Sequence, residues 1–132
     1  MDGFDFVHHE IVRFNDLDGM DHVNNAVYAT YMESARLAYL ESLGTGRNPQ
    51  KSLILARLEI DFRSPISFGE EVEIGVRTSR VGTKSFDLDH EVRADGRLAA
   101  EGKSVLVAFD YTTNSSRELP PEWRELLEGV PA

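Results

Sequence analysis

Residues 12–36 read VRFNDLDGMDHVNNAVYATYMESAR and hold the densest group of reactive side chains in the chain. A run of alternating apolar residues ends at Phe14, a helical pattern begins at Asn24 or Asn25, and a loop lies between them. The amides of a helix's first turn have no partner inside the helix, so a loop that leads into them favours a site for negative or developing negative charge. The loop carries four potential acid, base or ligand groups: Asp16, Asp18, Asp21 and His22.

The composition is that of an ordinary globular protein. The chain has 132 residues, 41% of them apolar and 28% charged, and we expect a single domain over residues 1–132. A net charge of -9 argues against broad nucleic-acid binding. No apolar run approaches the roughly 20 residues that span a bilayer, and the N-terminus lacks the basic start and apolar stretch of a signal peptide. We therefore expect no membrane partner and a cytoplasmic location. The absence of cysteine excludes a disulfide, a thiolate metal site and a cysteine nucleophile.

The segment from Asn24 or Asn25 to about Leu43 is the predicted long helix. Asparagine is a good N-cap residue, and Gly44 follows the last periodic position, as glycine commonly does at helix C-termini. Further leucines lie off the main apolar stripe, so the helix is apolar over more than half of its circumference and must be wrapped by other elements. The stripe itself has spacings of three and four residues and consists of Tyr28, Tyr31, Met32, Ala35, Ala38 and Tyr39.

Period-two alternation predicts the strands. One strand precedes the helix at residues 4–14, and four follow it at about residues 56–63, 72–81, 86–92 and 97–113. Asp95-Gly96 is a strong hairpin signal, and Gly102 predicts a bulge or bend that lets the last strand curve. The four strands after the helix are predicted to form an antiparallel meander, followed by a short helix over residues 122–128. The predicted fold class is therefore α+β, a curved antiparallel sheet with one long helix against it.

Counting excludes several familiar motifs. Gly102-Lys103-Ser104 resembles the end of a phosphate-binding loop, but five residues rather than four separate Gly96 from Gly102. The loop aspartates suggest a calcium loop, yet Gly19 falls at position four rather than six, and Val27 stands where such a loop has glutamate. We expect no metal, and metal binding by the aspartates with His22 is kept as an alternative. The chain also lacks the GxSxG elbow of serine hydrolases.

Asp18 is the candidate catalytic group. Most loop aspartates cap a turn or a helix, but a carboxylate next to unpaired helix amides is able to attack an electrophile or activate water while the amides receive the developing oxyanion. His22, four residues further on, is interpreted as a general acid or base, a substrate-orienting donor or a loop-packing side chain. Asp16 is expected to be structural, and His90 is expected to be a core histidine.

Other groups have an ordinary interpretation and a functional one. Tyr28 and Tyr31 are typical of a core or an interface, although a tyrosine hydroxyl near the loop is able to contact substrate. Glu33 and Arg36, three residues apart, predict a modest ion pair on the helix flank. Basic residues surround the Val81-Gly82 turn and predict either a solvated hairpin tip or a patch for nucleotide phosphates: Arg77, Arg80 and Lys84.

The loop and the helix together resemble the signature of the hotdog-fold thioesterases. The matching residues are Asp16-Leu17-Asp18, His22-Val23-Asn24-Asn25, Tyr28, Tyr31, Glu33, Ala35 and Arg36. The chain is similar to the 4-hydroxybenzoyl-CoA thioesterase-like group, and to acyl-ACP (acyl carrier protein) and long-chain acyl-CoA thioesterases whose loop reads DxDxxxHVNN. The resemblance covers about residues 7–110. It implies a long central helix wrapped by a five- to six-stranded antiparallel sheet, in agreement with the element order above.

The resemblance also implies a mechanism. Asp18 is the nucleophile or the general base toward water, and the backbone N–H of Asn25 supplies the oxyanion contact with help from the helix dipole. His22 and Asn24 orient the thioester or the loop. The remaining candidates, all for substrate binding, are Tyr28, Arg80 and Lys84.

Two departures from the family pattern leave the substrate open. Met20 stands where plant-type acyl-ACP relatives have asparagine, and Asn25 stands where the aromatic-substrate branch has tyrosine. The expected reaction is hydrolysis of an acyl-CoA or acyl-ACP thioester to a free acid and a thiol. It needs no metal or redox cofactor, because coenzyme A is part of the substrate, and the family implies a homodimer or homotetramer. The alternatives are a non-catalytic acyl-CoA-binding module and an enoyl-thioester hydratase, whose spacing from acid to histidine differs from that of Asp18 and His22.

Overall fold

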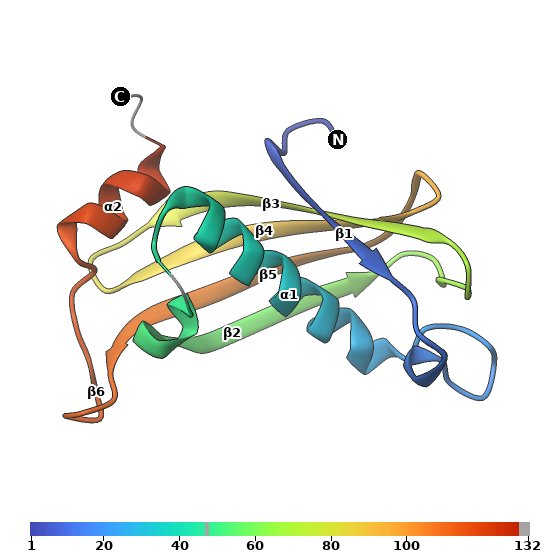
Figure 1. The fold of residues 1–132 in the computed structure, drawn as a ribbon, viewed down its shortest axis with the longest axis horizontal. Helices are drawn as coiled ribbons and strands as arrows, with labels where there is room; N and C mark the ends of the chain where they lie inside the picture. The colour runs from blue at the N-terminus through green and yellow to red at the C-terminus, as the bar shows by residue number, and fades with distance from the viewer. Residues whose placement is uncertain (47, 130–132) are drawn as a thin grey trace.

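The structure is a computed structural model that describes residues 1–46 and 48–129. Its strands, drawn as arrows in Figure 1, are β1 (Phe6–Ile11), β2 (Leu53–Phe62), β3 (Glu71–Val81), β4 (Ser85–Ala94), β5 (Arg97–Asp110) and β6 (Ser115–Ser116). The helices are the long α1 (Asn25–Leu43) and the short α2 (Pro121–Glu128), and two 3₁₀ turns are η1 (Phe14–Asp16) and η2 (Pro49–Ser52). The predicted helices and strands therefore occur in the predicted order.

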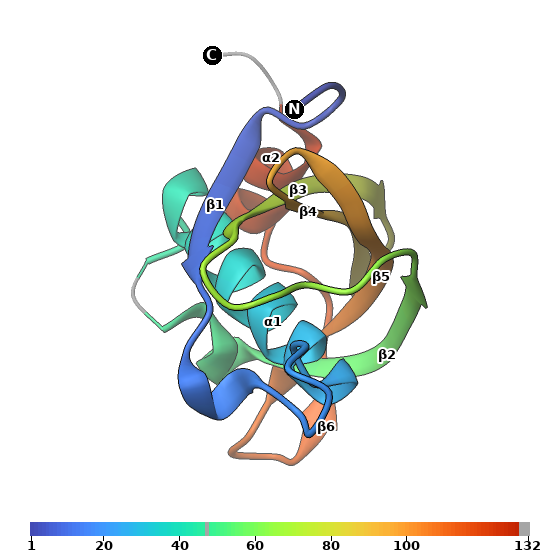
Figure 2. The same cartoon turned by 90° about the vertical axis from the view of Figure 1, so that its right-hand side faces the viewer.

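The sheet is antiparallel throughout, with the strand order β1-β3-β4-β5-β2 and with β6 paired to the end of β5. Figures 1 and 2 show it curling around α1, so that the helix fills the hollow of the sheet. This arrangement confirms the predicted α+β class and the predicted five- to six-stranded sheet around a central helix. In the described part of the chain, no helix has the length and apolarity that crossing a bilayer requires.

The position of β2 differs from the prediction. β3, β4 and β5 form a meander through tight turns, whereas β2 pairs with β5 at the far edge of the sheet, with Leu53 opposite Ala108 and Phe62 opposite Ala100. The connection over residues 63–70 crosses the open end of the curled sheet, as Figure 2 shows, instead of making a tight hairpin. The prediction of a four-stranded meander is therefore wrong for β2.

α1 begins and ends at the residues that suit its caps. The side chain of Asn24 accepts a hydrogen bond from the amide of Ala26 at 2.9 Å, and Gly44 ends the helix in the left-handed conformation at φ 95°. The inner face of α1 packs on the buried side chains of the sheet, so the core lies between the two. The residues of α1 that are buried there are Tyr28, Tyr31, Met32, Ala35, Arg36 and Leu40.

Gly102 does not form the predicted bulge. It pairs regularly with Ile60 of β2 and His90 of β4, and the register shifts of the sheet fall at other residues. A Cβ atom at this position would lie 2.8 Å from the backbone oxygen of Glu59 and 2.8 Å from Cε of Met32. The absence of a side chain therefore allows α1 and β2 to approach β5 closely.

Candidate active site

The loop between η1 and α1 is closed by its own backbone (the blue loop at the lower right of Figure 1). Leu17 and Val23 pair across it, and the amide of Asp18 donates to the carbonyl of His22 at 2.7 Å. Asp21 lies in the left-handed region at φ 61°, which aspartate adopts more readily than most residues. These contacts hold the loop in one tight conformation directly before the helix.

One oxygen of the Asp18 carboxylate stabilises this loop. Oδ1 accepts hydrogen bonds from the amides of Met20 at 2.8 Å and His22 at 3.3 Å, so the turn-capping role of a loop aspartate is present. Oδ2 has no hydrogen-bond partner among the residues that the structure describes, and Asp18 is exposed. The first oxygen thus fixes the orientation of the carboxylate, and the second is available to a ligand or to water.

The first turn of α1 leaves one amide free. The amide of Asn24 donates to the carbonyl of Asp16 at 2.8 Å, that of Ala26 to the side chain of Asn24 at 2.9 Å, and that of Val27 to the carbonyl of Asn24 at 2.8 Å. Across residues 1–46 and 48–129, no acceptor lies within hydrogen-bond distance of the amide of Asn25. Asn24, a predicted substrate contact, is therefore the N-cap of α1. The helix dipole adds partial positive charge at the free amide.

A cavity opens at the start of α1, between the helix and the end of β2. Tyr28 forms one wall, with its ring edge-on to Phe62 at a centroid distance of 5.0 Å and its hydroxyl donating to the carbonyl of Ser64 at 3.3 Å. Burial raises the pKa of Tyr28, and the nearby charge of Asp18 contributes in the same direction. The cavity has a volume of about 260 Å³ and is lined by Asn25, Tyr28, Phe62, Arg63, Ser64 and Pro65.

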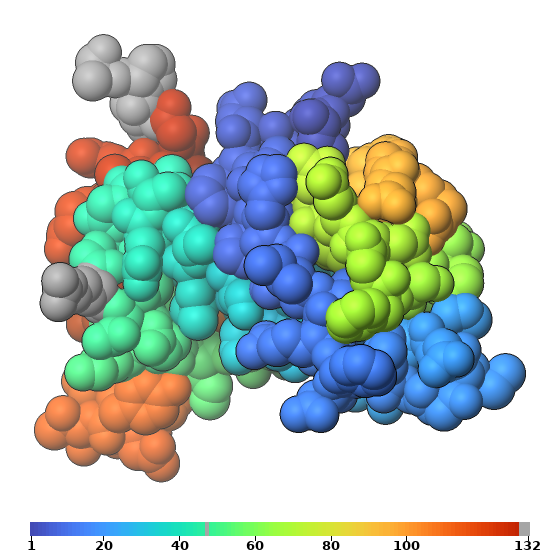
Figure 3. Space-filling view, turned by 45° about the vertical axis from the view of Figure 1, so that its right-hand side comes forward, coloured from blue at the N-terminus to red at the C-terminus, as the bar shows by residue number. Residues whose placement is uncertain are grey.

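The segment after β2 supports the loop from the other side. His22 pairs with Ser67 through the backbone, and Figure 3 shows the blue atoms of the loop region near the yellow-green atoms of this segment. Arg97 fixes the segment by donating to Glu70 at 2.9 Å and to the carbonyl of Pro65 at 2.7 Å, and its guanidinium holds the pKa of Glu70 below the usual value. The ring of His22 makes no hydrogen bond within the described residues, so its catalytic role stays a prediction.

Asp16 has the structural role expected of it. Its Oδ2 accepts hydrogen bonds from the amide of Arg13 at 2.9 Å and from the hydroxyl of Tyr31 at 2.7 Å. Neither this carboxylate nor that of Asp18 is part of a metal-ligating cluster. Among residues 1–46 and 48–129, no three His, Cys, Asp or Glu side chains gather closely enough to hold a metal ion.

The structure does not bring Arg80 and Lys84 to Asp18 within one chain. Both lie around the hairpin between β3 and β4, and the 11 residues of β3 separate that hairpin from the segment next to the loop. At a rise of about 3.3 Å per residue, this strand is roughly 35 Å long. Arg80 is already paired, donating to Asp87 at 2.9 Å and to Ser85 at 2.8 Å. Arg80 and Lys84 therefore lie at the opposite end of β3 from the loop that contains Asp18.

Two buried polar side chains between α1 and the sheet, His90 and Arg36, were only partly predicted. Burial lowers the pKa of His90 to about 3, and its Nε2 lies 2.6 Å from Oγ of Ser104, so the expected core histidine is confirmed. Arg36 forms the expected ion pair, with Nη2 3.6 Å from the carboxylate of Glu33, but it is only 5% exposed and does not lie on the flank. Its spacing of four residues from Met32 on the buried stripe is the sequence signal for this position.

Comparison with known proteins identifies the family of this fold and loop. The sequence model of the thioesterase-like superfamily matches residues 12–127. A solved thioesterase from Thermus thermophilus, complexed with coenzyme A and Zn, is 39% identical and superposes with a TM-score of 0.90 over 100% of both chains. The long-chain acyl-CoA thioesterase FadM of Escherichia coli is 28% identical over 124 residues, covering 89% of this chain and 92% of FadM.

A third relative is the 1,4-dihydroxy-2-naphthoyl-CoA hydrolase of Nostoc punctiforme, which is 25% identical over 128 residues, covering 93% of this chain and 86% of the hydrolase. The family match extends over most of the chain, from the loop that contains Asp18 to α2. The chain therefore belongs to the thioesterase-like superfamily of hotdog-fold thioester hydrolases.

Proposed function

We propose that this protein hydrolyses acyl-CoA thioesters to a free acid and the thiol of coenzyme A, with Asp18 as the reacting carboxylate. The observation that carries the proposal is that the loop and the helix start that follows it hold two groups without a hydrogen-bond partner among the described residues: Oδ2 of Asp18 and the amide of Asn25. Three relatives are named as thioesterases or CoA thioester hydrolases, which supports the same substrate class.

The carboxylate of Asp18 and the amide of Asn25 suit different steps of the reaction: the carboxylate starts the attack, and the amide stabilises the negative oxygen that forms. Acting as a base, Asp18 takes a proton from water, whose oxygen attacks the thioester carbonyl; acting as a nucleophile, it forms an acyl anhydride that water then cleaves. In either route the carbonyl oxygen becomes negative and accepts a hydrogen bond from the amide of Asn25. One such donor typically contributes about 3–4 kcal/mol of transition-state stabilisation. The intermediate then expels the thiolate, and His22 and Asn24 orient the thioester or the loop.

The groove between α1 and β2 is the proposed site of the acyl group. One cavity lies at Asn25, and a second, of about 430 Å³, lies between α1 and β2. The second cavity is lined by the leucines Leu37, Leu40, Leu53 and Leu55 and by the polar side chains of Glu33, Arg36 and Gln50. Leu37 lies 12 residues after Asn25, which is roughly 18 Å of helix at about 1.5 Å per residue. In this proposal the acyl chain starts at the free amide and runs along the helix toward the leucines of the second cavity.

We also propose a dimer or tetramer in which two copies share this site. β2 pairs with β5 along one edge, and within the described residues its other edge has no strand partner. Antiparallel pairing of two β2 strands would bring the hairpin end of one copy beside the Asp18 end of the other. In that pairing Arg57 of each strand is able to face Glu59 of its neighbour, a favourable cross-strand pair. Arg80 and Lys84 then reach the substrate of the second copy.

The proposal is tested with purified protein and a panel of CoA thioesters, with short, medium, long and aromatic acyl groups, by following free thiol. Turnover of at least one acyl-CoA is the expected result, and the same acyl group on acyl carrier protein tests the second carrier. The reaction is expected to proceed in the presence of a chelator, because coenzyme A enters as part of the substrate and no metal or redox cofactor is required. Tight binding of acyl-CoA without turnover would favour a non-catalytic acyl-CoA-binding module.

Changing Arg80 and Lys84 together to alanine is expected to raise KM for acyl-CoA while kcat stays the same. Two surface contacts with phosphates, each worth about 0.7 kcal/mol, correspond to roughly tenfold in KM. The N-acetylcysteamine thioester of the same acid lacks phosphates, so its KM should not change. The matched control changes Arg93 and Lys103, two cations on the outer face of the sheet. An unaltered KM for acyl-CoA in the Arg80 and Lys84 variant removes both residues from the site.

A further inference from the structure

Tyr31 ties the loop of Asp18 to the middle of α1. Its side chain is 1% exposed, and its hydroxyl donates to Oδ2 of Asp16 at 2.7 Å. Burial and this carboxylate raise the pKa of Tyr31, so the hydroxyl keeps its proton and donates over the physiological pH range. A hydrogen bond to a carboxylate is stronger than one between neutral groups.

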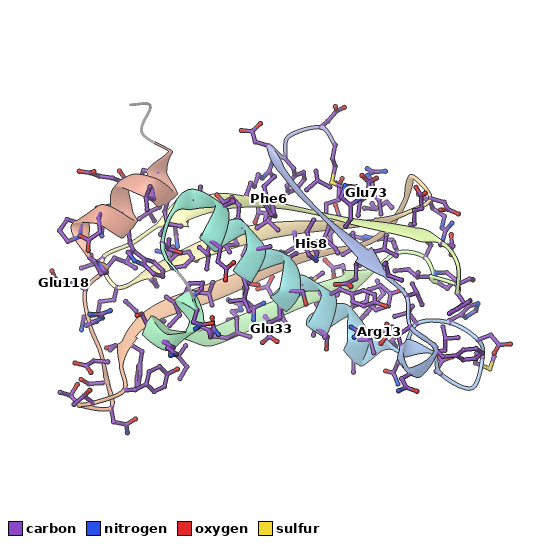
Figure 4. All side chains as sticks on the ribbon, in the orientation of Figure 1. Phe6, His8, Arg13, Glu33, Glu73 and Glu118 are labelled. Atoms are coloured by element: carbon purple, nitrogen blue, oxygen red, sulfur yellow. The ribbon has the colours of Figure 1, made fainter. Side chains whose placement is uncertain are left out.

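Asp16 connects this hydroxyl to both groups of the proposed site. Its backbone carbonyl accepts the amide of Asn24, the residue before the free amide of Asn25, and its Oδ2 also accepts the amide of Arg13. Figure 4 shows Arg13 where the chain enters the loop, at the N-terminal end of α1. The carboxylate of Asp16 is thus bonded to α1 and to Arg13, its backbone carbonyl is bonded to the cap of α1, and Asp18 follows two residues later in the same loop.

We propose that Tyr31 is a positioning residue which, through Asp16, sets the distance between the carboxylate of Asp18 and the amide of Asn25. The inference rests on the proposed function of these two groups. Tyr31 itself does not reach the substrate, because its hydroxyl is occupied and its ring is buried. Its effect is on geometry, and a displacement of about 1 Å between reacting groups is able to cost as much as a hundredfold in rate.

The test compares Tyr31→Phe with Tyr39→Phe. Tyr39 lies on the same helix, and its hydroxyl bonds to Oγ1 of Thr78 at 2.7 Å, far from the loop. Both variants lose one tyrosine hydrogen bond, so both should lower the melting temperature. Only Tyr31→Phe is expected to lower kcat, by roughly tenfold, with KM within about threefold of wild type. Unchanged kcat in Tyr31→Phe, or an equal fall in both variants, overturns the proposal.

A pair of changes at Asp16 covers the case in which Tyr31→Phe fails to fold. Asp16→Asn keeps an oxygen that accepts the Tyr31 hydroxyl, whereas Asp16→Ala removes it. The proposal expects kcat to be at least about fivefold higher in the asparagine variant than in the alanine variant. Equal values in the two variants contradict it.

A measurement without turnover separates this proposal from the proposed function. Hydrogen exchange reports on the amides of Met20 and His22, which bond to Asp18, and both should exchange faster in Tyr31→Phe than in Tyr39→Phe. If exchange is faster but the wild-type protein cleaves no thioester, the positioning role of Tyr31 is supported and the hydrolase function is rejected. If exchange is unchanged in an active enzyme, only the positioning role of Tyr31 is rejected.

Discussion

Replacing Asp18 with asparagine is expected to lower kcat for acyl-CoA hydrolysis by at least about a hundredfold, with the protein still folded. The asparagine side chain keeps an oxygen that accepts the amides of Met20 and His22, so the loop should retain its conformation. Its amide nitrogen is neither a nucleophile nor a base, and the function assigned to Oδ2 is lost. The measurement is free-thiol release at saturating substrate, together with the melting temperature of the variant.

Asp21→Asn is the control for this change. It removes the same charge from the same loop, and asparagine is among the few residues that readily adopt the left-handed conformation found at φ 61°. We expect its kcat to stay within about threefold of wild type, since Asp21 is not assigned to the chemistry. Near-wild-type activity of Asp18→Asn would refute the assigned role, and a comparable loss in both variants would attribute the effect to net charge.

The parts of the site that follow local rules could be predicted from the sequence. The sequence predicts an asparagine N-cap at Asn24 or Asn25, and the structure selects Asn24, whose side chain bonds the amide of Ala26 and leaves that of Asn25 free. Asp18 lies in the short polar loop before that cap, and its choice over Asp16 and Asp21 rests mostly on the resemblance to the thioesterases. Its turn-capping role is equally local. In the structure Oδ1 caps the turn, while Oδ2 has no partner among the described residues.

The groups that hold the site together could not be predicted in this way. The bond from Tyr31 to Asp16 joins residues 15 positions apart. The apolar stripe predicts that Tyr31 is buried, but it does not name the partner of the hydroxyl. Arg36 lies on the same buried face, where its charge interrupts the apolar pattern. The position of β2 next to β5 is also non-local, because alternation predicts a strand without naming its neighbour.

Gly102→Ala is expected to lower the free energy of unfolding by about 2–3 kcal/mol, near the upper range for overpacking a core. The new methyl group would lie 2.8 Å from the backbone oxygen of Glu59, which moves only with β2, and 2.8 Å from Cε of Met32. Met32 is able to change its rotamer, but the backbone oxygen is held by the pairing of β2 with β5. The expected fall in melting temperature is roughly 10 °C, measured by calorimetry.

Gly75→Ala is the matched change, because it also adds one methyl group within the sheet. A Cβ at that position meets Sδ of Met1 and the side chain of Phe4, which belong to the N-terminal segment before β1 rather than to a paired strand. That segment is able to shift, and alanine gains up to about 1 kcal/mol over glycine from the unfolded chain, so the net change should be small. Equal losses of unfolding free energy in the two variants would mean that the backbone of β2 shifts as easily as the N-terminal segment. The packing of α1 on β5 would then not depend on the missing side chain at Gly102. The position of Asn25, at the start of α1, would not depend on it either.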